Sequence, residues 1–289
     1  MECRRGTSDD CTPDFCFIAL VASVLVTGVG SAHADSGDKI ETSYDVDVRG
    51  VTVLRISYSS EISATGFRSQ AVIKTKGIVK VFSDYRIKMA AVGAFIDGRS
   101  SPQNYTSQSE KNDKEKTVNL NWSKGALAAS GRPAAKNPEI KADIDEALTP
   151  GVTDPLTAIF RIGASPGGNP CRAVHRIFDG KEVFELRFSF KGEAVLDDSL
   201  PGAYHGKAYE CQASYMPIAG RYATKFRKRN EEPPIYKVWL APIGVDVAGE
   251  SRLIPVRATG RLDGMKFEAY ASRLKVDGRP FKTVSASVN

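Results

Sequence analysis

Residues 184–191 read FELRFSFK, a clear pattern of a half-buried β-strand. Phe or Leu occupies every second position, and Glu, Arg, Ser or Lys fills the positions between them. Successive side chains of a β-strand point to opposite faces of a sheet, so this alternation predicts a strand with one buried face. The same period recurs in 54–59 (LRISYS), 118–123 (VNLNWS) and 265–272 (MKFEAYAS). Strands are therefore expected from end to end.

Asp-Gly pairs separate many of these runs. They occur at Asp97-Gly98, Asp179-Gly180, Asp263-Gly264 and Asp277-Gly278. Asp-Gly favours the tight type I′ turn of β-hairpins, because this turn needs positive φ at both central residues. The sequence therefore predicts an all-β, mainly antiparallel fold, built as a large curved sheet, a half-barrel or a β-spiral-like sheet.

A short helix is expected near the middle of the chain, within 153–162. Asp154 suits the N-cap, and Pro155 suits the first helical position, where its missing N–H costs nothing. Apolar residues then share one face of about two turns, which would plug or flank a curved sheet. A second helical turn is expected near 144–148, and 163–170 (GASPGGNP) reads as a loop. One or two short helices near the middle are predicted.

An export signal is predicted at the start of the chain. Residues 15–29 read FCFIALVASVLVTGV, and a small-x-small site, Ala-His-Ala, ends at Ala34. This pattern is typical of a secretory signal peptide. We predict cleavage after Ala34, which divides the chain into a signal peptide (1–34) and a single periplasmic β domain (35–289). An uncleaved anchor and a split into two domains near residue 150 remain alternatives. No later stretch approaches the ~18 apolar residues of a transmembrane helix, so no span is expected in the mature chain.

Exactly two cysteines, Cys171 and Cys211, follow the predicted signal peptide, which contains the other three cysteines. In an exported protein they are expected to form a disulfide. It would close a loop of about 40 residues and contribute roughly 4 kcal/mol in the chain-entropy model. A zinc site would need further ligands at short spacing, and only His175 and His205 lie near the two cysteines. We predict a disulfide, no metal and no cofactor.

Catalytic motifs are not visible in the sequence. His175 and His205 could each act as a general base. Neither lies in a G-x-S-x-G elbow or an H-E-x-x-H helix, and the glycine-rich 163–168 follows the predicted helix instead of preceding it. The chain is not expected to be an enzyme. A hydrolase that uses one of these histidines as its base is kept as a third hypothesis, after the two non-enzymatic functions described at the end of this subsection.

The basic run KFRKR at 225–229 is the sharpest charge feature. Lys225, Arg227, Lys228 and Arg229 are the candidate contacts to an anionic partner. An exported protein is not expected to meet nucleic acid, so the functional interpretation is an anionic lipid or an envelope polymer. The simpler interpretation, which the sequence favours, is a solvated hairpin tip. The whole chain carries a net charge of +6, and residues 35–289 alone carry an excess of eight basic residues.

Several short motifs occur in an order that resembles the DUF3108 family of exported bacterial proteins of unknown function. They are YDV at 44–46, RGV at 49–51, KTKGIV at 74–79, DPLTA at 154–158, FDGK at 178–181, YKVWL at 236–240 and IPV at 254–256. The resemblance covers most of residues 40–275. It implies an envelope location and an antiparallel β-architecture comparable to the half-barrels of lipoprotein-sorting carriers. It implies no catalytic residues.

These features predict a periplasmic, non-enzymatic envelope protein that supports envelope integrity. Its partner would be a lipid-like ligand, sheltered by an apolar concave face, or an envelope polymer. The alternative is a scaffold that docks another envelope protein through a sheet edge or the basic run.

Overall fold

Antiparallel strands dominate the computed structural model, which describes residues 38–281 apart from 78–79, 81–83, 112–113, 132–136, 165–170, 198–199, 201, 230–231, 246–250 and 263. The strands are β1 (Asp38–Val48), β2 (Val51–Ile62), β3 (Gly66–Thr75), β4 (Tyr85–Ile96), β5 (Arg99–Lys111), β6 (Lys114–Ser123), β7 (Ala126–Gly131), β8 (Val174–Phe178), β9 (Val183–Leu196), β10 (Gly206–Ala219), β11 (Ile235–Val245), β12 (Ser251–Leu262), β13 (Met265–Val276) and β14 (Arg279–Pro280). The helices are α2 (Pro138–Ala147), α3 (Pro155–Gly163) and α4 (Arg221–Arg229). The predicted signal peptide and its cysteines lie outside the described residues.

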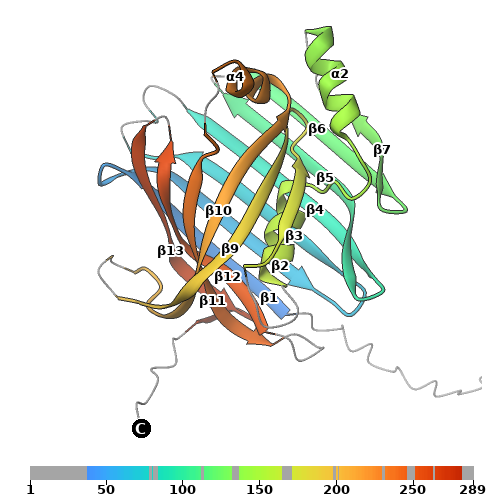
Figure 1. The fold of residues 1–289 in the computed structure, drawn as a ribbon. Coiled ribbons are helices and arrows are strands. Elements are labelled where there is room, and N and C mark those ends of the chain that lie inside the picture. The colour runs from blue at the N-terminus through green and yellow to red at the C-terminus, as the bar shows by residue number, and fades with distance from the viewer. Residues whose placement is uncertain are drawn as a thin grey trace, which may run out of the picture. The chain divides into compact units, whose positions relative to one another are not determined.

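The strands form one 14-stranded sheet in the order β7-β6-β5-β4-β3-β2-β1-β13-β12-β11-β10-β9-β8, with β14 paired to β13. Each half is a meander of sequence neighbours, and the pairing of β1 with β13 joins the halves. The sheet is open and curved (Figure 1). This confirms the predicted all-β, mainly antiparallel fold. Helices α2 and α3 lie near the middle of the chain, as predicted, and α4 is an additional helix.

The Asp-Gly turns follow the prediction in part. Asp97 and Asp277 have φ angles of 49° and 51°, and the glycine after each also has a positive φ, as type I′ turns require. At Asp179 the side chain instead accepts hydrogen bonds from the backbone N–H of Lys181 and Glu182, at 2.7 and 2.8 Å. Asp263 lies outside the described residues.

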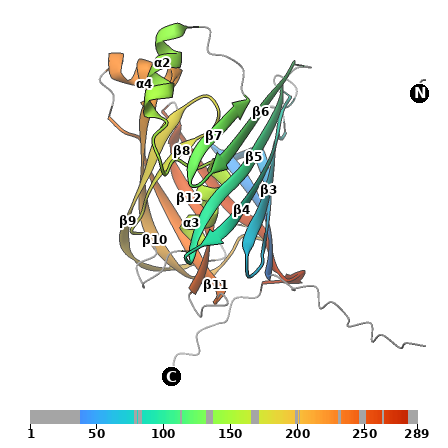
Figure 2. The ribbon, with the colours of Figure 1, turned by 90° about the vertical axis from the view of Figure 1, so that its right-hand side faces the viewer.

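Helix α3 lies against the concave face of the sheet (Figures 1 and 2). It contacts β3, β4 and β5 in one half of the sheet, and β8 and β12 in the other. Its buried residues include Leu156 and Phe160, and the Phe160 ring stacks on Phe67 of β3 with centroids 4.1 Å apart. Asp154 caps the helix as predicted, accepting from the backbone N–H of Leu156 and Thr157 at 2.9 Å each.

The residues just before α3 connect strands near the two margins of the sheet. The indole N–H of Trp122 on β6 donates to the carbonyl of Val152 at 2.9 Å. Thr153 donates through its backbone N–H to Arg176 and accepts from Phe178, at 2.9 and 2.8 Å, so it pairs with β8. Backbone groups at a sheet edge need partners when they are buried. The segment leading into α3 supplies partners for β8.

The predicted disulfide is present. Cys171 precedes β8 and bonds to Cys211 on β10, with the two Cα atoms 5.6 Å apart. Both cysteines are fully buried and pack with Ile162, Leu240 and Leu253. The crosslink therefore ties the segment after α3 to the C-terminal half of the sheet.

Replacing Cys171 or Cys211 by Ser should lower the free energy of unfolding by about 4 kcal/mol, because the unfolded chain regains the entropy of a 40-residue loop. The double variant should lose no more than either single variant, since one change removes the whole crosslink. Denaturant unfolding curves measure this. Equal stability of the oxidised and reduced wild-type protein would contradict it.

Candidate functional site

The basic run predicted as a hairpin tip forms helix α4, so that expectation was wrong. Residues 221–229 (RYATKFRKR) consist mainly of residues that favour helices, namely Ala, Lys and Arg. The helix begins directly after Gly220, which follows the end of β10 and has a φ of 118°. A Cβ on Gly220 would lie 2.2 Å from the carboxylate of Glu182. The turn into α4 therefore requires glycine, for its positive φ and for the space.

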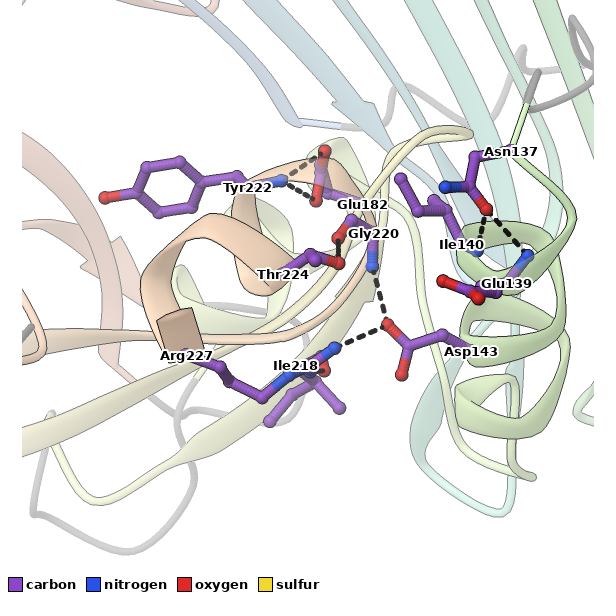
Figure 3. Close-up of polar contacts among 10 residues, drawn as sticks. All are labelled: Asn137, Glu139, Ile140, Asp143, Glu182, Ile218, Gly220, Tyr222, Thr224 and Arg227. Carbon is purple, nitrogen blue, oxygen red and sulfur yellow. Dashed lines mark hydrogen bonds and ion pairs between the residues drawn. The ribbon is translucent and has the colours of Figure 1, made fainter. Parts of the chain in front are cut away.

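Glu182 provides a hydrogen-bond acceptor for the first turn of α4. Both of its carboxylate oxygens accept from the backbone N–H of Tyr222 at 3.1 Å (Figure 3). A carboxylate at this end also interacts favourably with the helix dipole. Burial raises the pKa of Glu182, and the amide hydrogen bonds of Tyr222 and its neighbours oppose that shift.

Asp143 on α2 holds α4 from a second side. One of its oxygens accepts from the backbone N–H of Gly220 at 3.2 Å and from the Arg227 guanidinium at 3.0 Å (Figure 3). Arg227 also donates to the carbonyl of Ile218 at 2.7 Å. Helix α2 is fixed in turn by its cap, Asn137, and by the fully buried Ile144.

These contacts divide the four predicted basic residues into two groups. Arg227 pairs with Asp143 and docks the helix, although its side chain is 50% exposed, and Lys225, Lys228 and Arg229 are exposed as well. Arg221, which was not among the predicted contacts, is exposed one turn before Lys225. Residues three, four and seven apart share a face of a helix, so Arg221, Lys225 and Lys228 form one basic stripe.

Aromatic rings lie beside this stripe. Tyr222 is 39% exposed and Phe226 is half-buried, with ring centroids 6.4 Å apart. Tyr222 meets Tyr215 of β10 edge-on at 6.0 Å, and Tyr215 in turn contacts Phe184 of β9. We call Arg221, Tyr222, Lys225, Phe226 and Lys228 the α4 surface.

The two histidines stand apart from this surface. His175 lies on β8, is 8% exposed and meets Phe188 edge-on at 6.2 Å. Burial lowers its pKa to about 4, with a smaller contribution from the charge of Arg161, so the ring is neutral at pH 7. His205 is exposed, just before β10. Among the residues that the structure describes, no group of three His, Cys, Asp or Glu side chains could hold a metal ion.

Comparison with known proteins identifies a family. A family model described as "Protein of unknown function (DUF3108)" matches residues 43–263. A crystal structure titled as a beta-barrel-like protein of the domain of unknown function DUF1849, from Brucella abortus, is 12% identical with a TM-score of 0.48, and the match covers 83% of this chain and 98% of that chain. No curated protein matches the chain. No helix in the described residues has the length and apolar character needed to cross a membrane.

Asp143→Ala should loosen α4, because it leaves the N–H of Gly220 and the Arg227 guanidinium without their shared acceptor. We expect amide hydrogen exchange in 221–229 to accelerate about tenfold, which corresponds to roughly 1.4 kcal/mol. Glu146→Ala, at an exposed position of the same helix, is the control and should leave exchange in α4 unchanged. Equal exchange in both variants would show that Asp143 does not hold the helix.

His175 should make the fold acid-sensitive. The unfolded chain takes up a proton near pH 6.5, whereas the folded protein resists it until about pH 4. Stability is therefore lost as the pH falls through this window, by up to about 3 kcal/mol. Burial raises the pKa values of Asp154 and Glu182, which act in the opposite direction. The unfolding free energies of the wild type and of His175→Leu are therefore measured at pH 7 and at pH 4.5. Between these two pH values, the variant should lose less stability than the wild type.

Proposed function

The chain belongs to the DUF3108 family, whose function is unknown, and from this premise we propose that it is a non-enzymatic periplasmic envelope protein that binds anionic lipid surfaces through the α4 surface. The observation that carries the proposal is a stripe of exposed cations flanked by aromatic rings, on a helix that is held by Glu182, next to β9, and by Asp143 of α2. The periplasmic location follows from the predicted export signal.

The positive charge of the α4 surface suits the phosphate groups of an anionic membrane surface. Within the described part of the chain, no ion pair holds Arg221, Lys225 or Lys228, whereas Arg227 pairs with Asp143. Each basic residue near an anionic membrane contributes on the order of 1 kcal/mol. Three cations on one face therefore supply an affinity gain of about a hundredfold over a neutral surface.

The rings suit the boundary between headgroups and acyl chains. Tyr and Trp are enriched at this depth because each has an apolar ring and a polar group, and Phe adds apolar area on the membrane-facing side of interfacial helices. Tyr222 and Phe226 lie one turn apart beside the cations. Helices with this arrangement lie in the plane of the interface, which requires no span.

The position of α3 favours binding at the α4 surface over carriage on the concave face. A lipid carrier keeps an apolar concavity accessible to an acyl chain. Here α3 lies on the concave face and buries Leu156 and Phe160 against it. The non-enzymatic part of the proposal is supported by His175, which is buried against Phe188 and whose pKa of about 4 lies far below that of an efficient general base at pH 7.

Vesicle co-sedimentation tests the proposal. Residues 35–289 should bind vesicles of phosphatidylcholine with 30% phosphatidylglycerol at least ~100-fold more tightly than vesicles of phosphatidylcholine alone, and added salt should weaken the binding. Replacing Arg221, Lys225 and Lys228 together by Glu should abolish the difference.

The control replaces Lys74, Lys88 and Lys114 by Glu, which changes the net charge equally at exposed positions on the sheet. This control should retain most of the binding. Loss of binding in both triple variants would mean that net charge alone attracts the protein, and that α4 has no special role.

A further inference from the structure

A groove crosses four neighbouring strands, β13, β1, β2 and β3, far along the chain from α4. The strand register places eight lining residues in two rows that run across the strands. One row is Lys275, Glu41, Ser59 and Gln70, and the other is Arg273, Ser43, Ser57 and Val72. Residues directly opposite in neighbouring strands point to the same face, so both rows share one face of the sheet.

That face is the convex one. Thr42, Tyr58 and Ala71 form the row between the other two, and all three are buried, with 4%, 8% and 3% exposure. Tyr58 and Ala71 belong to the same core cluster as Leu156 of α3. Since alternate residues point to opposite faces, the serine rows face away from α3.

Differences in side-chain length produce the hollow. The two middle strands present the short Ser43, Ser57 and Ser59, while Arg273 and Lys275 on β13 form one wall and Gln70 and Val72 on β3 form the other. The resulting cavity has a volume of about 280 Å³. This is near the lower end of the ~300–1,000 Å³ found for small-molecule sites.

The lining is positive and rich in hydrogen-bonding groups. Within the described residues, neither Arg273 nor Lys275 has an ion-pair partner, and Glu41 pairs with Lys39 at 3.5 Å. Each serine hydroxyl can donate one hydrogen bond and accept two, and the amide of Gln70 can do both. Val72 is the one large apolar side chain in the two rows.

We propose that this groove binds an acidic saccharide. Arg273 and Lys275 would hold a carboxylate or phosphate substituent through charge-assisted hydrogen bonds, and Ser57, Ser59 and Gln70 would bind the ring hydroxyls. The two walls are three strands apart, about 14 Å, so an isolated anion at the cationic wall cannot reach the amide wall. A sugar ring with an anionic group, within a longer chain that crosses the open groove, meets both. The proposal does not depend on lipid binding by α4.

Isothermal titration calorimetry on the purified full chain tests it with three probes. They are a tetrasaccharide of alternating glucuronic acid and N-acetylglucosamine, the neutral N-acetylglucosamine tetramer, and inorganic phosphate. The acidic tetrasaccharide should bind at least ~10-fold more tightly than either of the others. Equal binding of the neutral tetramer would overturn the role of the cations, and equal binding of phosphate would overturn the saccharide assignment.

Two variants locate the site. Arg273→Ala combined with Lys275→Ala should weaken binding of the acidic tetrasaccharide about 100-fold. Lys266→Ala combined with Arg279→Ala removes the same charge from exposed positions outside the groove and should leave the affinity unchanged. Ser59→Leu, which fills the floor, should abolish binding while the melting temperature and the unchanged β-sheet circular dichroism show that the fold persists. Equal losses in the two double variants, or full affinity in Ser59→Leu, would overturn the proposal.

Discussion

Phe160 of α3 stacks on Phe67 of β3, and Leu156 and Ile162 of the same helix are buried beside it. A curved sheet with an apolar concave face must cover that face, because burying it is the main driving force for folding. Helix α3 provides part of this cover, and it contacts strands in both halves of the sheet.

The segments on either side of α3 are fixed by its insertion. Before the helix, Val152 and Thr153 connect β6 with β8, and after it Cys171 is tied to β10. Strand β8 continues through a tight turn to Glu182, which caps α4, and α2 carries Asp143, which holds the same helix. Glu182 and Asp143 thus hold the α4 surface in place, and this surface is where we expect a partner to bind.

The local sequence was sufficient to predict the features that depend on local physics. The alternation in FELRFSFK gave strand β9, and Asp154 with Pro155 marked the start of α3. The lone cysteine pair of residues 35–289 predicted the disulfide. Helix α4 was missed because its caps come from Glu182 and Asp143, which are 40 and 77 residues away from their partners. The groove was missed because β1 meets β13 across more than 200 residues, a pairing that no local pattern specifies.

We propose that the partner binds at α4 while α3 stays in place on the concave face. Hydrogen exchange with and without vesicles that contain phosphatidylglycerol tests this most directly, because it reports on both helices in one experiment. We expect slower exchange in 221–229 on vesicle binding and unchanged exchange in 155–163. Unchanged exchange in 221–229 together with altered exchange in 155–163 would contradict it, since the lipid would then displace α3 from the concave face.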